Sequence, residues 1–268
     1  MHQIVGMAIL DPLITIQDIS NEFDNLSYST VRRVLLENGI GSYISAKKTL
    51  LTNSRKLTRL RYCQSMVNFN SWFSTVFCDE SMFCTAYLGS KRVLRLRGTR
   101  FDEEFLNLID FSGRISVSVF GLITSRGFGP LIRIQGRLNS SQYCEILEDC
   151  LPFLQEKFPD DNYYWLQDNC PVHTSNESMR FIRLNFHGGY IHHPPYSPDL
   201  NPIENIWALV KRDLKFLPKA NSEDELFGQI EHIWNLLSVD QCLLFNLYDS
   251  MSRRVETCIA NQGAYTKY

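Results

Sequence analysis

The stretch PYSPDLNPIENIW, residues 195–207, leads from a proline-rich loop into a helix. Asn201 can cap that helix, and Pro202 suits its first position, where a missing backbone N–H costs nothing. Glu204 then falls in the first turn, and Trp207 is expected to anchor the helix in the core. A glutamate three residues after an asparagine can also close a capping box, so Glu204 by itself has an ordinary structural explanation.

Two further acids follow apolar runs earlier in the chain. Residues 74–78 are β-prone and lead into Asp79, and residues 163–166 predict a strand that leads into Asp168. Ligands of open α/β sheets bind just beyond such strand ends. Taken singly, each acid is better explained as a solvated strand end, so a functional interpretation depends on the three acids together.

Three carboxylates that converge from two strand ends and a helix start suit divalent cations. Mg²⁺ prefers oxygen ligands and usually takes one or two protein carboxylates per ion, with water and substrate phosphate as its other ligands. Two ions about 3.5–4 Å apart can activate an attacking oxygen and stabilise a leaving one. We therefore predict that Asp79, Asp168 and Glu204 are catalytic and metal-binding residues, with two Mg²⁺ or Mn²⁺ ions per site. The chain has no glycine-rich phosphate loop, so no nucleotide cofactor is expected.

The rest of the chain after residue 70 mixes strands and helices. Apolar runs predict a hairpin, with a strand over 114–124, a turn at 127–129 and a second strand over 131–134. Further elements are expected as helices over 140–157 and about 176–185, a short strand at 189–192, a helix from 202, and two helices near the C-terminus. This order predicts an α/β fold in which helices flank a mixed sheet.

The N-terminal residues 1–40 predict a small all-α helix-turn-helix region. A helix over 15–23 precedes a tight turn, and Ser27 or Ser29 can cap a second helix. Many helical pairs with this pattern bind nothing, so the pattern alone is weak. Two arginines near the start of the second helix are expected to point outward and contact DNA: Arg32 and Arg33.

Positive charge is concentrated locally, although the chain as a whole carries a net charge of −2. Residues 1–66 hold eight lysines and arginines against five aspartates and glutamates, and phosphate binding needs local cations rather than a basic total. Residues 41–70 predict a basic linker and a helix. The predicted DNA contacts outside the helix-turn-helix are Lys47, Lys48, Lys91, Arg92, Arg95, Arg97 and Arg100. A solvated basic surface explains the same residues equally well.

Composition excludes several classes of protein. At 44% hydrophobic and 21% charged residues, the chain is ordinary for a globular protein, and no apolar run is long enough to span a membrane. The eight cysteines are scattered and form no CxxC pair, which argues against disulfides and structural zinc and favours reduced thiols in an intracellular protein. The neighbours His192 and His193 point to opposite faces of a strand, so they are not expected to form a paired metal motif.

Three segments resemble the signature blocks of the Tc/mariner DNA transposases. They are FCDESMF (residues 77–83), QDNCPVHT (residues 167–174) and PYSPDLNPIENIW (residues 195–207). The resemblance covers roughly residues 12–235. It implies a ribonuclease-H-like catalytic domain over 71–268, in which Asp79 and Asp168 are the paired aspartates and Glu204 is the closing glutamate. Between Asp168 and Glu204 lie 35 residues, one more than is usual in the family.

The resemblance also implies an activity. A Tc-like transposase would cut at the ends of its element and join the freed 3′-hydroxyl to target DNA in the nucleus. Its partners would be double-stranded DNA, both inverted repeats and target, and a second subunit in a homodimer on DNA, with no membrane. His173 has a counterpart in the family's second block, and we expect it to anchor its loop.

Two alternatives remain open from the sequence. Family members usually carry two helix-turn-helix units, whereas residues 1–40 provide room for one, which resembles the second of the pair. The chain could therefore be an inactive or domesticated relic that binds DNA without transposing it. A ribonuclease or junction nuclease on the same fold is a third possibility, which the specific third block disfavours.

Overall fold

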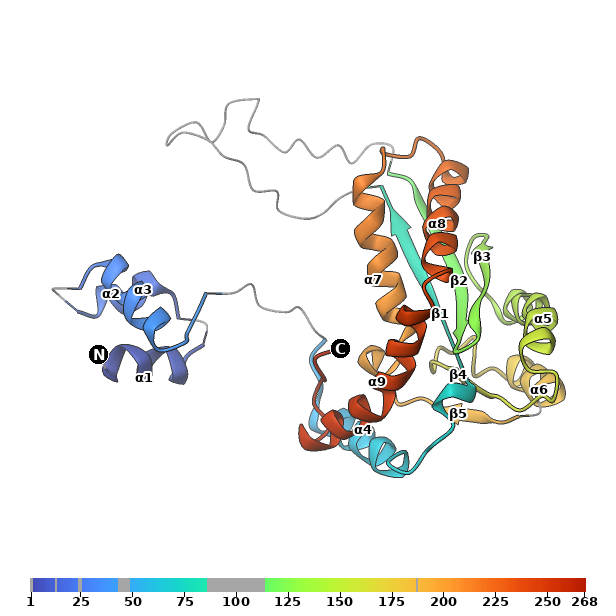
Figure 1. Ribbon diagram of the computed structural model, residues 1–268, viewed down its shortest axis with the longest axis horizontal. Helices are drawn as coiled ribbons and strands as arrows, with labels where there is room; N and C mark the ends of the chain where they lie inside the picture. The colour runs from blue at the N-terminus through green and yellow to red at the C-terminus, as the bar shows by residue number, and fades with distance from the viewer. Residues whose placement is uncertain (1, 13, 24–25, 43–48, 86–113, 187) are drawn as a thin grey trace. The chain divides into compact units, whose positions relative to one another are not determined.

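The protein forms two compact units, Met1–Leu50 and Leu51–Tyr268. A computed structural model describes residues 2–12, 14–23, 26–42, 49–85, 114–186 and 188–268 (Figure 1). The predicted DNA contacts at Lys47, Lys48 and the five cations of residues 91–100 lie outside the described residues. Among the helices within these ranges, none is both long enough and apolar enough to cross a membrane. Within these ranges, the cysteines form no disulfide bond.

The first unit contains three helices: α1 (His2–Leu10), α2 (Ile16–Asn21) and α3 (Tyr28–Glu37). Thr15 caps α2 and closes a capping box with Asp18, and Ser27 caps α3 by accepting a hydrogen bond from the backbone of Thr30. These caps place the predicted helix pair as expected, while α1 adds a third helix. The small core consists of Ile4, Ile19, Val31, Val34 and Leu35.

The second unit is built on one mixed sheet of five strands in the order β3-β2-β1-β4-β5. The strands are β1 (Thr75–Cys84), β2 (Ser116–Thr124), β3 (Gly127–Ile134), β4 (Tyr164–Gln167) and β5 (Tyr190–His192). β1, β2 and β3 are antiparallel neighbours, whereas β4 and β5 run parallel to β1. The sheet confirms the predicted α/β class.

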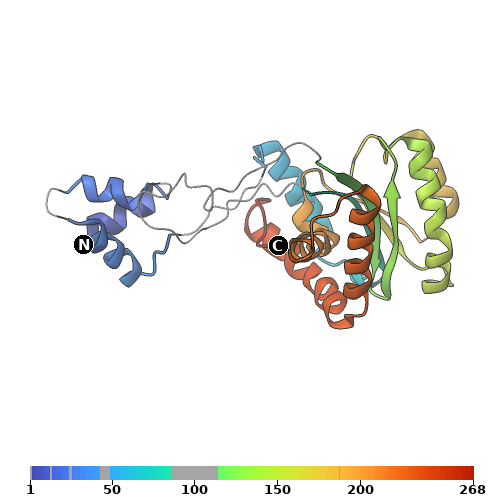
Figure 2. The same ribbon diagram turned by 90° about the horizontal axis from the view of Figure 1, so that it is seen from above.

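Helices cover both faces of this sheet. They are α4 (Asn53–Ser65), α5 (Ser140–Lys157), α6 (Asn176–Asn185), α7 (Ile203–Asp213), α8 (Glu223–Ser238) and α9 (Gln241–Ala260). Side chains alternate along β1, so that Val76 and Cys78 pack towards α5 and α6 while Phe77 packs towards α7, α8 and α9. Figure 2 shows these two groups of helices on opposite sides of the sheet. α4, which the sequence placed with the linker, packs against α9 in this unit.

The hairpin turn differs from its prediction. The turn is Ser125-Arg126, because β2 extends to Thr124 and β3 already begins at Gly127. The hydroxyl of Thr124 closes the turn by donating to the Gly127 carbonyl at 3.0 Å and accepting from the Arg126 amide at 3.1 Å. Gly129 lies within β3, where close packing leaves no room for a side chain: a Cβ at this position would lie 2.2 Å from the Leu122 side chain. The turn predicted at 127–129 was therefore wrong.

Candidate active site

The three predicted acids, Asp79, Asp168 and Glu204, line one pocket of about 510 Å³. Asp168 directly follows β4, and Glu204 is the second residue of α7. Asp79 lies within β1 rather than past its end, because β1 continues to pair with β2 as far as Cys84. The parallel pairing of β1 with β4 ends earlier, at Phe77 opposite Leu166. Asp79 and Asp168 each lie two residues beyond this last pair.

A hydrogen bond ties the third acid to the first. The side-chain amide of Asn201 donates to the carbonyl of Cys78 at 3.2 Å, so the start of α7 is attached to β1 beside Asp79. The cap differs by one position from its prediction: Pro202 occupies the N-cap position without a side-chain hydrogen bond, whereas the side-chain oxygen of Asn201 accepts from the Ile203 amide at 3.4 Å. Asn201 also spans the gap between helix and strand, while its backbone carbonyl accepts from the Glu204 amide at 3.2 Å.

The carboxylates of the pocket repel one another. Burial raises the pKa of Asp79 well above its usual value, and the negative charges of Glu204, Glu80 and Asp168 raise it further. Within the described lining of the pocket, no lysine or arginine balances the charge of these carboxylates.

Asp168 is held differently, by donors within its own loop. Although burial raises its pKa, hydrogen bonds from the ring of His173 and the backbone amide of Cys170 outweigh it, so the pKa of Asp168 lies below its usual value. The two donor–acceptor distances are 2.7 and 2.8 Å. Asp168 is therefore oriented as an anion before any cation or substrate arrives.

His173 bridges two acids. Its Nδ1 contacts Asp168 at 2.7 Å and its Nε2 contacts Glu80 at 3.0 Å. Burial lowers its pKa, but the two carboxylates outweigh burial and raise the pKa of His173 to about 10. The sequence analysis predicted an anchoring role for this histidine. It did not predict the contact with Glu80, although the position of Glu80 next to Asp79 was an available signal.

The comparison with known proteins assigns the family. A DDE superfamily endonuclease model matches residues 74–227, and a transposase helix-turn-helix model matches residues 1–68. The Tc1 transposase of Caenorhabditis elegans is 31% identical over 248 residues, which cover 90% of this chain and 88% of the relative. The Tcb2 transposase of Caenorhabditis briggsae is 30% identical with the same coverage. The chain belongs to the Tc1-like DDE transposases.

Solved structures confirm the fold of this transposase. The Mos1 transposase paired-end complex with the left transposon end superimposes with a TM-score of 0.82 at 17% identity, over 98% of this chain and 79% of that one. The Mos1 paired-end complex with Mn gives a TM-score of 0.77 at 17% identity, over 98% and 79% of the two chains. The predicted ribonuclease-H-like sheet, preceded by a helix-turn-helix, is thus confirmed.

The pocket of the transposase fits divalent cations in its chemistry. Its three acids offer oxygen ligands, the type that Mg²⁺ and Mn²⁺ prefer. Within the described part of the chain, no group of three or more histidine, cysteine, aspartate or glutamate side chains is placed so that it could hold a metal ion. An open arrangement suits ions that each take only one or two protein carboxylates and leave positions for water and phosphate.

The two neighbouring histidines of the transposase lie in different environments, as predicted. His192 is exposed, whereas His193 is buried and its Nε2 donates to the carbonyl of Ser197 at 3.0 Å. Burial lowers the pKa of His193 to about 4, so its ring is neutral near pH 7. The carbonyl of His193 also accepts a hydrogen bond from the side chain of Asn169, the residue that follows Asp168.

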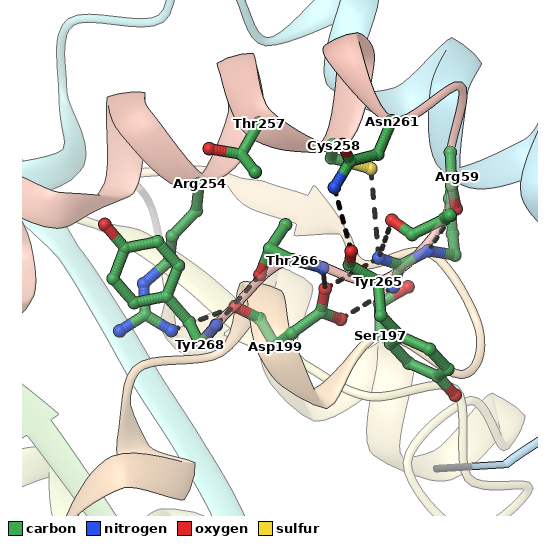
Figure 3. Close-up of polar contacts among 12 residues, drawn as sticks. Arg59, Ser197, Asp199, Arg254, Thr257, Cys258, Asn261, Tyr265, Thr266 and Tyr268 are labelled. Carbon is green, nitrogen blue, oxygen red and sulfur yellow. Dashed lines mark hydrogen bonds and ion pairs between the residues drawn. The ribbon is translucent and has the colours of Figure 1, made fainter. Parts of the chain in front are cut away.

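A buried ion pair anchors the loop before α7 (Figure 3). Arg59 of α4 donates to both oxygens of Asp199 at 2.8 Å, and neither side chain is exposed. The amide of Thr266 donates to the same carboxylate at 2.8 Å. From α9, Arg254 donates to the carbonyl of Asp199 at 2.9 Å and to the side chain of Asn205, next to Glu204, at 2.8 Å.

This anchor was missed in the sequence, where Arg59 counted towards a solvated basic face. Its partner Asp199 lies 140 residues away, so local composition carried no signal. The predicted DNA contacts Arg32 and Arg33 are both exposed on α3, and their role stays a prediction.

Proposed function

We propose that this transposase cuts DNA at the ends of a mobile element and joins the freed 3′ ends to target DNA, using Asp79, Asp168 and Glu204. The observation that carries the proposal is that β1, the end of β4 and the start of α7 bring these three acids to one pocket. The family match and the names of the nematode relatives support it. The reaction exchanges one phosphodiester for another, so positioning and charge are its main requirements.

We also propose that the three acids hold two Mg²⁺ or Mn²⁺ ions. Such ions, when bound, lower the pKa of an attacking water or hydroxyl and neutralise charge on the leaving oxygen. The mutual repulsion of the acids and the lack of a lysine or arginine among the described lining residues support this assignment. Mos1, which shares the fold, has been solved as a paired-end complex with Mn and with Mg.

The chain's own residues supply orientation around the acids. His173 and the Cys170 amide hold the Asp168 carboxylate as an oriented anion. The Asn201 amide keeps α7, and with it Glu204, beside β1. These hydrogen bonds reduce the reorganisation required when a phosphodiester enters the pocket.

DNA recognition completes the proposal. The second helix of the helix-turn-helix, α3, would enter the major groove with Arg32 and Arg33 near the phosphates. Lys47, Lys48 and the cations Lys91, Arg92, Arg95, Arg97 and Arg100 would add phosphate contacts. Two element ends require two active sites, which favours a homodimer on DNA. We propose the nucleus as its location, because a DNA-joining enzyme needs access to target DNA.

The test is strand cleavage of a duplex that carries the element's terminal inverted repeat, in Mg²⁺ or Mn²⁺. We expect Asp168→Ala to reduce cleavage at least about 100-fold, because it removes several kcal/mol of transition-state stabilisation. Asp160→Ala is the matched control, since Asp160 is an exposed aspartate outside the pocket. Equal cleavage by the wild type and Asp168→Ala would overturn the assignment of the acids. Binding without cleavage by the wild type would identify a DNA-binding relic.

A further inference from the structure

Tyr196 combines features that a purely structural residue does not need. It lines the same pocket as the three acids, yet it remains 47% exposed. It follows two prolines, in the loop between β5 and the short helix Pro198–Leu200. An exposed aromatic ring beside a site that handles DNA is a potential contact for a base.

The backbone of Tyr196 adopts a costly conformation. Its φ is +55°, in the left-handed region that bulky side chains rarely enter. Two hydrogen bonds to consecutive carbonyls hold the main chain here. The Tyr196 carbonyl accepts from Nη1 of Arg59 at 3.2 Å, and the carbonyl of Ser197 accepts from His193 at 3.0 Å. Because Arg59 is itself fixed by its buried pair with Asp199, the main chain at Tyr196 is held rigidly. Strain maintained in this way is typical of functional positions.

The ring of Tyr196 is also held in place. The guanidinium of Arg55, one helical turn before Arg59 on α4, lies 3.6 Å from the centre of the ring. This cation–π contact orients the ring and places positive charge beside it. Backbone and side chain are therefore both fixed before substrate binds, which lowers the entropic cost of a contact made by the ring.

We propose that the Tyr196 ring, supported by Arg55, is a stacking platform for one unpaired nucleobase next to the phosphodiester that is cut or joined. The proposal rests on the proposed function and deepens it by naming a subsite for the DNA. Enzymes that draw DNA into a pocket unstack bases, and stacking on an aromatic ring offsets part of that cost. Because every base has a π face, the platform tolerates any sequence.

The alternative is that the Arg55–Tyr196 contact only connects α4 to the loop. Three variants separate the two roles. Tyr196→Phe keeps the ring, Tyr196→Asn removes the ring but tolerates the left-handed backbone, and Tyr196→Ala removes the ring without that tolerance. Phe216→Ala is the matched control, because Phe216 is an aromatic residue that is 82% exposed and lies outside the pocket.

The experiment combines each protein variant with a series of modified DNA duplexes. Cleavage by the full chain is measured on element-end duplexes that carry a single abasic site at each position flanking the cut. On intact DNA, we expect Phe216→Ala to cleave like the wild type. Tyr196→Asn and Tyr196→Ala should lose about tenfold, as expected for one stacked base, and Tyr196→Phe should restore most of that loss because it keeps the ring. At one abasic position, the wild type should fall to the rate of Tyr196→Asn, and Tyr196→Asn should lose nothing more. The platform would be overturned if the abasic site and Tyr196→Asn reduced the cleavage rate independently of each other at every position. A wild-type cleavage rate for Tyr196→Asn on intact DNA would also overturn it.

A second measurement does not depend on activity. The base analogue 2-aminopurine is placed at each flanking position, and its fluorescence is recorded in complexes with Asp168→Ala and with the double variant Asp168→Ala, Tyr196→Asn. Stacking on the ring quenches the analogue, so we expect brighter emission from the double variant at one position. Equal emission at all positions would refute the platform even if the wild type cleaves normally. Failure of the wild type to cleave, with this difference in emission present, would contradict the proposed function alone.

Discussion

Two loops leave the sheet at the ends of the neighbouring parallel strands β4 and β5, and each is held by a buried histidine. In the β4 loop, residues 168–175, His173 lies between two carboxylates and its pKa is raised to about 10. In the β5 loop, residues 193–202, His193 donates to a backbone carbonyl and its pKa is lowered to about 4 by burial. Near pH 7 one ring is therefore charged and the other neutral.

The difference shows how the same residue type serves two purposes. The charged His173 offsets part of the negative charge of the acids and orients Asp168. The neutral His193 closes a backbone turn, and a separate buried ion pair, Arg59–Asp199, adds to the rigidity of the β5 loop. Electrostatic support for the acids thus comes from one loop, and mechanical support for Glu204 comes from the other.

The largest expected effect comes from breaking the anchor of the β5 loop. Arg59→Met leaves the Asp199 carboxylate buried without its partner, which should cost about 3–5 kcal/mol of unfolding free energy. Urea denaturation at pH 7 measures the loss. The control is Arg253→Ala, which removes an exposed pair with Asp249 and should cost less than about 1 kcal/mol. Equal losses in the two variants would show that the buried pair does not anchor the loop.

The next largest effect is the response of the neutral His193 to acidic pH. Below its ordinary pKa of 6.5, His193 takes up a proton in the unfolded chain, whereas in the folded protein it does so only near pH 4. Unfolding free energy should therefore fall with decreasing pH across this window, by up to about 1.4 kcal/mol per pH unit. His193→Gln, compared with the wild type by urea denaturation at pH 7 and pH 5, should lose this part of the pH dependence. An identical pH dependence in both proteins would contradict the neutral assignment.

The charged histidine should affect activity. His173→Gln cannot bridge Glu80 and Asp168 as a cation, so cleavage should fall about 10–100-fold, the usual cost of losing a residue that orients a metal ligand. DNA binding, measured by fluorescence anisotropy, should not change. His192→Gln is the control because His192 is exposed on the adjacent strand. Loss of DNA binding in His173→Gln, or full cleavage activity, would show that His173 does not act through Asp168.

Much of this fold was predictable because its signals are local. Apolar runs indicated β2 and β4, and the helix predicted over 140–157 has these bounds in the structure. The acids were predictable because three blocks of sequence resemble one family. The rest depends on contacts distant in the chain: Asp79 lies inside β1 because β2 extends that strand, and Arg59 is buried because Asp199 and the C-terminal residues enclose it. The roles of Arg32, Arg33 and the other predicted DNA contacts remain predictions.

The central claim is that Asp79, Asp168 and Glu204 form a single cation-binding site. Calorimetric titration of Mn²⁺ into the full chain tests it most directly, with the wild type, Asp79→Asn, Asp168→Asn, Glu204→Gln and the exposed control Asp160→Asn. We predict that the wild type and the control bind Mn²⁺ with the same affinity and that each of the other three variants binds at least about tenfold more weakly. Unchanged Mn²⁺ affinity in any one of these three variants would contradict the claim.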